Sequence, residues 1–200
     1  MRILILTHPR SGGFSLLSWI SSEIGLKSYH EPLSDPGVSP DIWNPKLCPD
    51  VIIKEHASRF IERGMSIQGV IEGFDKVIFH TRRNLDEASI SRAKQLDSGD
   101  SHLVYVMNTQ WEEDHHRQIL EASRELSDSR SLILSQASLC EGAHITTTYC
   151  GVYREFTDIP IITKFLGILD PQWLDIIHPK RRLQNGESSL PAPHKRPKFI

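Results

Sequence analysis

The opening segment constrains the fold more than any other part of this chain, because it joins an apolar strand, a glycine turn and the start of a helix. Residues 3–6 form an unbroken apolar run, which is typical of a strand covered on both faces. Pro9 ends this run, and Gly12-Gly13 allow backbone angles that other residues resist. Apolar residues then recur at helical spacing over 16–20. The segment therefore predicts a strand–loop–helix unit, similar in outline to a P-loop.

The loop of this unit predicts an anion site. Such a turn directs several backbone N–H groups at one point, and the helix dipole makes that point attractive to an anion. Arg10 adds a guanidinium whose forked donors match phosphate or sulfate oxygens. The loop is not a Walker A sequence, because no Lys-Ser or Lys-Thr pair follows its glycines. We therefore expect a phosphate or sulfate cradle in which the cation precedes the glycines.

Residues 76–91 predict a second strand–helix unit with polar side chains at its junction. Asp86 and Glu87 fall in the first turn of the expected helix, where negative charge is favoured. Arg83 and Ser91 lie at the strand end and about two turns into the helix. Taken alone, the pattern fits a solvated helix start with a surface serine equally well.

Together, the two segments resemble the PAPS-dependent sulfotransferases. The phosphosulfate loop of that family typically reads Pro-[Lys/Arg]-Ser-Gly-[Ser/Thr]-[Ser/Thr], and residues 9–12 match its first half. Gly13 and Phe14 occupy the usual hydroxyl positions, so either Ser15 supplies the displaced hydroxyl or backbone donors act alone. The family's Arg-[Asn/Asp]-Pro-x-[Asp/Glu]-x-x-x-Ser stretch is matched over 83–91, with leucine where proline is common.

The resemblance implies transfer of a sulfuryl group from 3′-phosphoadenosine 5′-phosphosulfate (PAPS) to a hydroxyl acceptor, a saccharide or a small molecule, by in-line displacement and without a metal. Arg83 and Ser91 would hold the 3′-phosphate. Arg10 would also stabilise the charge that develops on the reacting oxygens. The residues implied for the 5′ end are Arg10, Ser11, Gly12, Gly13, Phe14, Ser15 and Leu16.

Two residues are candidates for the base that takes the acceptor's proton. His56 ends an expected strand, and Lys54-Glu-His56 is similar to the Lys-x-His segment of cytosolic sulfotransferases. Glu31 lies in a Glu-Pro-Leu segment similar to that of carbohydrate and bacterial sulfotransferases. Histidine has a suitable ordinary pKa near 6.5, whereas a glutamate needs its pKa raised by burial. We favour His56 as the base and keep Glu31 as the other candidate. Alternatively, His56 is a helix-capping or core histidine, and Glu31 is an ordinary surface carboxylate.

Three later segments also fit the family. Residues 153–156 and 164–168 are similar to its Tyr-Glu-Asp-Leu and Phe-Leu-Gly stretches. The basic triplet 180–182 would return to the 3′-phosphate, as C-terminal segments of the family do, unless it is a solvated charge run.

Alternating strand and helix patterns predict an α/β protein with three α/β/α layers and a central, mainly parallel sheet. We expect one domain over 1–183 and a flexible basic tail over 184–200. Residues 34–50, with four prolines, are expected to form a loop. The expected strands are 2–7, 51–54 and 76–80, with weaker ones at 104–107 and 145–149, and the expected helices are 14–25, about 57–72, 86–97 and 110–127.

Composition restricts the partners. A hydrophobic content of 38% and a charged content of 24% are typical of globular proteins, and the net charge of −2 gives no reason to expect nucleic acid. No run is long enough for a transmembrane helix, and no signal peptide is recognisable, so we expect a cytoplasmic protein without a membrane partner. The three cysteines indicate free thiols. The oligomeric state stays open.

Two other functions stay open. A catalytically silent nucleotide-binding module would explain the missing hydroxyls at positions 13 and 14. A divergent P-loop kinase is disfavoured, because no magnesium-binding hydroxyl follows a loop lysine.

Overall fold

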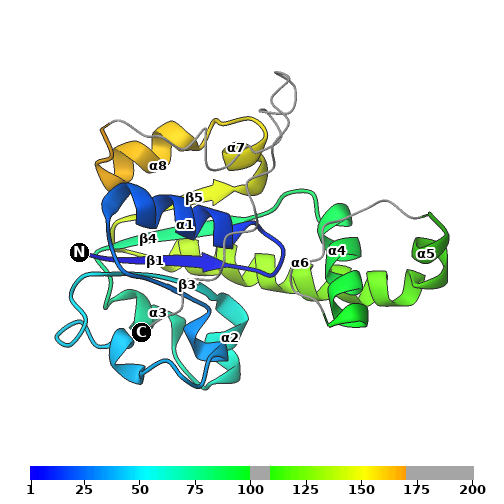
Figure 1. Cartoon of the computed structure of the whole chain (residues 1–200), viewed down its shortest axis with the longest axis horizontal. Coiled ribbons are helices and arrows are strands. Elements are labelled where there is room, and N and C mark those ends of the chain that lie inside the picture. Colours follow the sequence, from blue (N-terminus) through cyan, green and yellow to red (C-terminus); the bar gives the residue numbers. More distant parts are fainter. Residues whose placement is uncertain (100–108, 170–200) are drawn as a thin grey trace, which may run out of the picture.

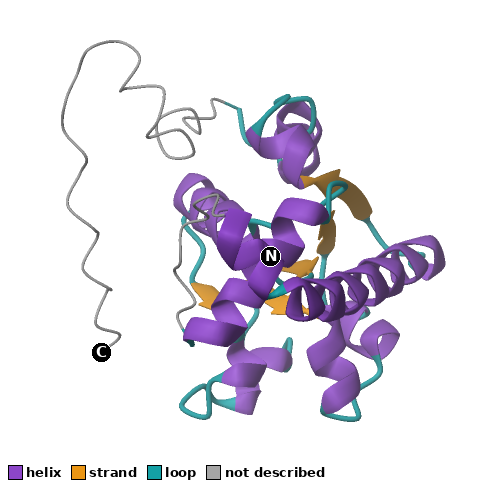
Figure 2. Cartoon of the chain, turned by 90° about the vertical axis from the view of Figure 1, so that its right-hand side faces the viewer, coloured by secondary structure: helices purple, strands orange, loops and turns teal. Residues whose placement is uncertain are grey.

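The computed structural model describes residues 1–99 and 109–169. Within these residues, five strands form one sheet in the order β2-β3-β1-β4-β5, and all neighbours are parallel. The strands are β1 (Arg2–Thr7), β2 (Ser28–His30), β3 (Val51–His56), β4 (Lys76–Thr81) and β5 (His144–Thr148). Helices cover both faces (Figures 1 and 2), so the predicted three-layer α/β/α fold is confirmed.

The helices fall into two layers with separate apolar cores. The helices are α1 (Gly13–Ile24), α2 (Ala57–Glu62), α3 (Ile67–Ile71), α4 (Asp86–Ser98), α5 (Thr109–Asp114), α6 (His116–Leu139), α7 (Tyr149–Tyr153) and α8 (Ile159–Leu166), with 3-10 turns η1 (Pro32–Ser34) and η2 (Pro40–Trp43). Ile3 and Ile5 of β1 pack with α1, α7 and α8, whereas Leu4 and Leu6 pack with α2, α3 and α6. Because successive strand residues point to opposite faces, β1 is buried on both sides, which explains its unbroken apolar run.

Several boundaries differ from the sequence expectation. The helix expected over 57–72 is two helices, because Gly64 has a φ of +66° and Ser66 caps the start of α3. The helix expected over 110–127 is divided into α5 and α6, and α6 runs on to Leu139. Strand β2 and helices α7 and α8 were not expected, and the loop over 34–50 contains η2. The strand expected at 104–107, the basic triplet and the tail lie outside the described residues.

The connections of β1 and its neighbour β3 diverge at the carboxyl end of β1. The chain leaves β1 through α1 on one face, and it leaves β3 through α2 and α3, which pack on the other face. In open α/β sheets, ligands bind where the connections of neighbouring strands diverge in this way. In Figure 1 the arrowhead of β1 points toward the side on which α4 stands. The loop after β1 therefore lies at the expected ligand position.

None of the helices within the described residues is both long and apolar enough to cross a membrane.

Candidate functional site

The β1–α1 loop is shaped by its two glycines. Gly12 has a φ of +83°, and a Cβ there would lie 2.8 Å from Tyr153 Cε2 and 2.9 Å from Tyr149 Cδ2. A Cβ at Gly13 would lie 2.7 Å from Thr7 Cγ2 and 2.9 Å from Lys54 Cε. Both positions therefore exclude larger residues, and Gly13 brings the loop directly over the Lys54 side chain.

Two buried histidines hold the loop. His8 donates from Nδ1 to the Pro9 carbonyl at 2.8 Å and accepts at Nε2 from the Arg82 amide at 3.0 Å. His80 donates from Nε2 to the Ser11 carbonyl at 2.8 Å and accepts at Nδ1 from the Thr147 hydroxyl. Burial lowers the pKa of His8 to about 4 and that of His80 to about 3. Both rings are therefore neutral in the folded protein at pH 7, each with its tautomer set by these bonds.

The start of α1 lacks a capping side chain. Its N-cap residue is Gly12, which provides no side-chain hydrogen bond to the first turn. Ser11 is 1% exposed, and its hydroxyl has no hydrogen-bond partner among the residues that the structure describes. A buried unpartnered hydroxyl beside an uncapped helix start is an arrangement that a bound anion would satisfy.

On the β4 side of β1, the structure joins the two predicted motifs. Arg10 donates from Nε to the Ser91 hydroxyl of α4 at 2.8 Å. Its backbone is in the left-handed region, with a φ of +60°, which is uncommon outside glycine and concentrates at functional sites. Burial, followed by the charges of Arg82 and Arg92, lowers the pKa of Arg10. The first loop and the start of α4 therefore meet in a region of positive charge.

Arg82, which the sequence left outside the predicted site, contacts the loop more closely than the predicted Arg83. Arg82 donates to the Arg10 carbonyl at 3.3 Å and pairs with Glu87 at 2.5 Å, and its guanidinium lies 4.3 Å from the centre of the Tyr149 ring. Arg83 is exposed. Arg82 is thus a further candidate for holding an anion on this side.

On the β3 side of β1, a charged cluster forms around the Glu31 carboxylate. Glu31 Oε1 lies 2.5 Å from Lys54 Nζ, 2.9 Å from His56 Nε2 and 3.2 Å from His30 Nε2. The side chain of Lys54 is 3% exposed and that of Glu31 is 25% exposed. Glu31 has a φ of +50°, so it shares the left-handed conformation of Arg10. The two candidate bases of the sequence analysis therefore form one hydrogen-bonded unit, to which the structure adds Lys54.

The protonation of this cluster follows from its contacts. Burial raises the pKa of Glu31, but the hydrogen bond and charge of His56 and the charge of Lys54 outweigh it, so the pKa lies below its ordinary value. Burial and the Lys54 charge lower the pKa of His56. A neutral His56 that donates from Nε2 to Glu31 accepts at Nδ1 from the Thr7 hydroxyl at 3.1 Å. Glu31 is therefore ionised, and both nitrogens of His56 are engaged.

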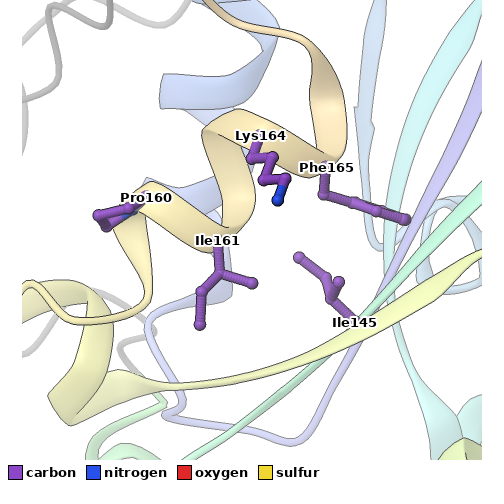
Figure 3. Close-up of a pocket in the computed structure, with 5 residues that line it drawn as sticks. All are labelled: Ile145, Pro160, Ile161, Lys164 and Phe165. Carbon is purple, nitrogen blue, oxygen red and sulfur yellow. The ribbon is translucent and has the colours of Figure 1, made fainter.

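Two further observations concern metal binding and the position of a pocket. Within residues 1–99 and 109–169, no group of three or more histidine, cysteine or acidic side chains could hold a metal ion. An open pocket of about 700 Å³ lies away from the β1–α1 loop, between α8 and the first half of β5, and is shown in Figure 3. Its lining is mainly apolar, with Lys164 as its charged member, so it lacks the converging polar groups of the loop region.

No model of a protein family matches the chain, and no curated protein is similar to it in sequence. The function is therefore inferred from the residues and the geometry of the site.

Proposed function

We propose that the chain is a sulfotransferase that moves a sulfuryl group from PAPS to a hydroxyl acceptor. The observation that carries the proposal is the 2.8 Å hydrogen bond from Arg10 Nε to the Ser91 hydroxyl. This bond brings together two motifs that are far apart in the sequence and that resemble opposite ends of one nucleotide site. One doubly phosphorylated adenosine could then bind the loop and α4 together.

The residues fit such a donor. The first N–H groups of α1, the Ser11 hydroxyl and Arg10 would hold the 5′-phosphosulfate end. Ser91, Arg83 and Arg82 would hold the 3′-phosphate. When bound, the donor supplies the sulfuryl group, whose bond to the bridging oxygen breaks as the acceptor oxygen bonds to sulfur.

The charged cluster on the β3 side supplies the acid–base chemistry of the proposal. Glu31 is ionised and partly exposed, but its lowered pKa makes the carboxylate a weak base, and the tautomer described above engages both nitrogens of His56. Both residues therefore stay candidates for the base, and the preference for His56 stays a prediction. The Lys54 ammonium, next to the loop at Gly13, stabilises negative charge near the transferred group.

Calorimetric titration with adenosine 3′,5′-bisphosphate in the presence of a magnesium chelator tests the nucleotide site. The wild-type chain is expected to bind, and Arg10→Ala to weaken binding roughly 10- to 100-fold, because a hydrogen bond to a charged group is worth about 1.5–3 kcal/mol. Arg83→Ala tests the 3′ end in the same way. Arg117→Ala is the control, because that side chain is 90% exposed on α6. A chain that ignores the bisphosphate and binds ATP only with magnesium would refute the proposal.

A catalytically silent nucleotide-binding module is the second candidate. It is favoured by the absence of a hydroxyl at positions 13 and 14 and by the engaged nitrogens of His56. Incubation with isotopically labelled PAPS and a fractionated pool of metabolites and glycans, followed by mass spectrometry, separates the two. Tight bisphosphate binding without any sulfated product would support the silent module.

A further inference from the structure

An exposed aromatic side chain stands at the acceptor side of the site. Phe14 follows Gly13 in the first turn of α1, and its side chain is large, apolar and 57% exposed. Its ring meets the His30 ring edge-on, with the centroids 4.9 Å apart and an interplanar angle of 83°. His30 in turn lies 3.2 Å from Glu31 Oε1. Phe14, His30 and Glu31 are therefore joined by successive contacts that end at Glu31, one of the two candidate bases.

These three residues and the arginines lie on opposite sides of β1. His30 ends β2 and is in register with Lys54 of β3, whereas Arg10 contacts α4, which follows β4. In the sheet order, β2 and β3 lie on one side of β1, and β4 lies on the other. A nucleotide held by the arginines would leave the Phe14 side open to a second molecule.

We propose that Phe14 and His30 form a platform for the ring that carries the acceptor hydroxyl. The inference rests on the proposed function and narrows its acceptor to hydroxyl compounds built on a six-membered ring, either pyranosides or phenols. The face of an aromatic ring carries partial negative charge, which attracts the C–H groups on the face of a pyranose or on the edge of a phenol ring. A linear alcohol offers no such ring. A ring held against Phe14 would direct its hydroxyl toward Glu31.

Ligand-observed NMR on the chain without nucleotide tests the platform independently of catalysis. Methyl β-glucopyranoside and p-nitrophenol are the two ring probes, and 1-butanol is the linear probe. We expect at least one ring probe to bind the wild-type chain and Phe14→Ala to weaken that binding about tenfold, because the variant loses both the aromatic contact and the apolar area that the ring buries. Phe14→Tyr should retain the binding. Which ring probe binds distinguishes a sugar from a phenol as the acceptor.

Ile61→Ala is the matched control, because Ile61 is also apolar and 58% exposed but lies on α2. Thermal unfolding of each variant verifies folding. Ring probes that bind Phe14→Ala as well as the wild type, or that do not bind at all, would overturn the platform. Bisphosphate titration of the same samples is read separately, so a failure of the nucleotide site and a failure of the platform are distinguishable.

Discussion

Replacing Glu31 by glutamine tests the charged cluster most directly. The substitution keeps the size of the side chain and removes its charge, so the buried Lys54 ammonium loses its carboxylate partner at 2.5 Å. Breaking a buried ion pair from one side costs about 3–5 kcal/mol, because the remaining charge is left uncompensated. Since the Glu31 side chain is 25% exposed, we expect the lower end, about 3 kcal/mol.

The expected loss is measurable in two ways. For a chain of 200 residues, 1 kcal/mol shifts Tm by about 2–4 °C, so Glu31→Gln should lower Tm by roughly 6–12 °C. Urea unfolding followed by circular dichroism should show a lower midpoint at an unchanged m value, because the folded surface is the same. Each measurement reports the free energy of unfolding independently of activity.

A double-mutant cycle separates the ion pair from packing. Lys54→Met removes the ammonium while keeping an unbranched chain, and the double variant Glu31→Gln/Lys54→Met should recover at least half of the Glu31→Gln loss. Glu62→Gln is the surface control; it breaks the exposed Arg59–Glu62 pair and should cost less than about 1 kcal/mol. The reasoning fails if Glu31→Gln costs no more than Glu62→Gln, or if the two changes in the cycle simply add.

Two other substitutions test the loop. Gly12→Ala should destabilise the fold by more than about 2 kcal/mol, because the new Cβ would meet Tyr153 and the residue would have a positive φ. Gly25→Ala is the control: its φ is +72° and nothing lies within 4 Å of the new Cβ, so it should show only the cost of the left-handed backbone. Equal losses of Tm in the two variants would refute the contact with Tyr153. The pKa of His8 is lowered to about 4, so the unfolded chain binds a proton that the folded chain does not between pH 6.5 and 4. The free energy of unfolding of the wild type should therefore decrease as pH falls through this window, by up to about 1.4 kcal/mol per pH unit more than that of His8→Gln. Urea unfolding midpoints are measured for both proteins at pH 7, 6 and 5. Midpoints that change with pH by the same amount in the two proteins would contradict the prediction.

The buried parallel strands could be predicted from the sequence because their physical signature is local. Strands β1, β3 and β4 are covered on both faces, so each contains an apolar run. Strand β2 is three residues long and partly exposed, and Ser28-Tyr-His30 has no such run. Helix α8 has only eight residues, with a proline among the first two, so the sequence offers too few turns for its apolar period to identify a helix.

The sequence selected candidate site residues but could not show which of them contact one another. Motif spacing singled out Arg10, Ser91, Glu31 and His56, yet no local pattern shows that they form two contacting pairs on either side of β1. The neighbouring residues Arg82 and Arg83 differ in burial because the end of β4 turns one toward the loop and the other outward. The direction of each side chain depends on the path of the backbone after β4, and the sequence of two adjacent arginines does not reveal that path.

The central position of β1 has a consequence for how the chain folds. β1 precedes both of its neighbours, and its pairing partners at Val51–His56 and Lys76–Thr81 are synthesised much later. Until then the ribosome exposes an apolar segment with two open edges, a state that invites aggregation. We expect nascent fragments that stop before residue 51 to show no sheet signal by circular dichroism, because β1 then lacks both of its pairing partners.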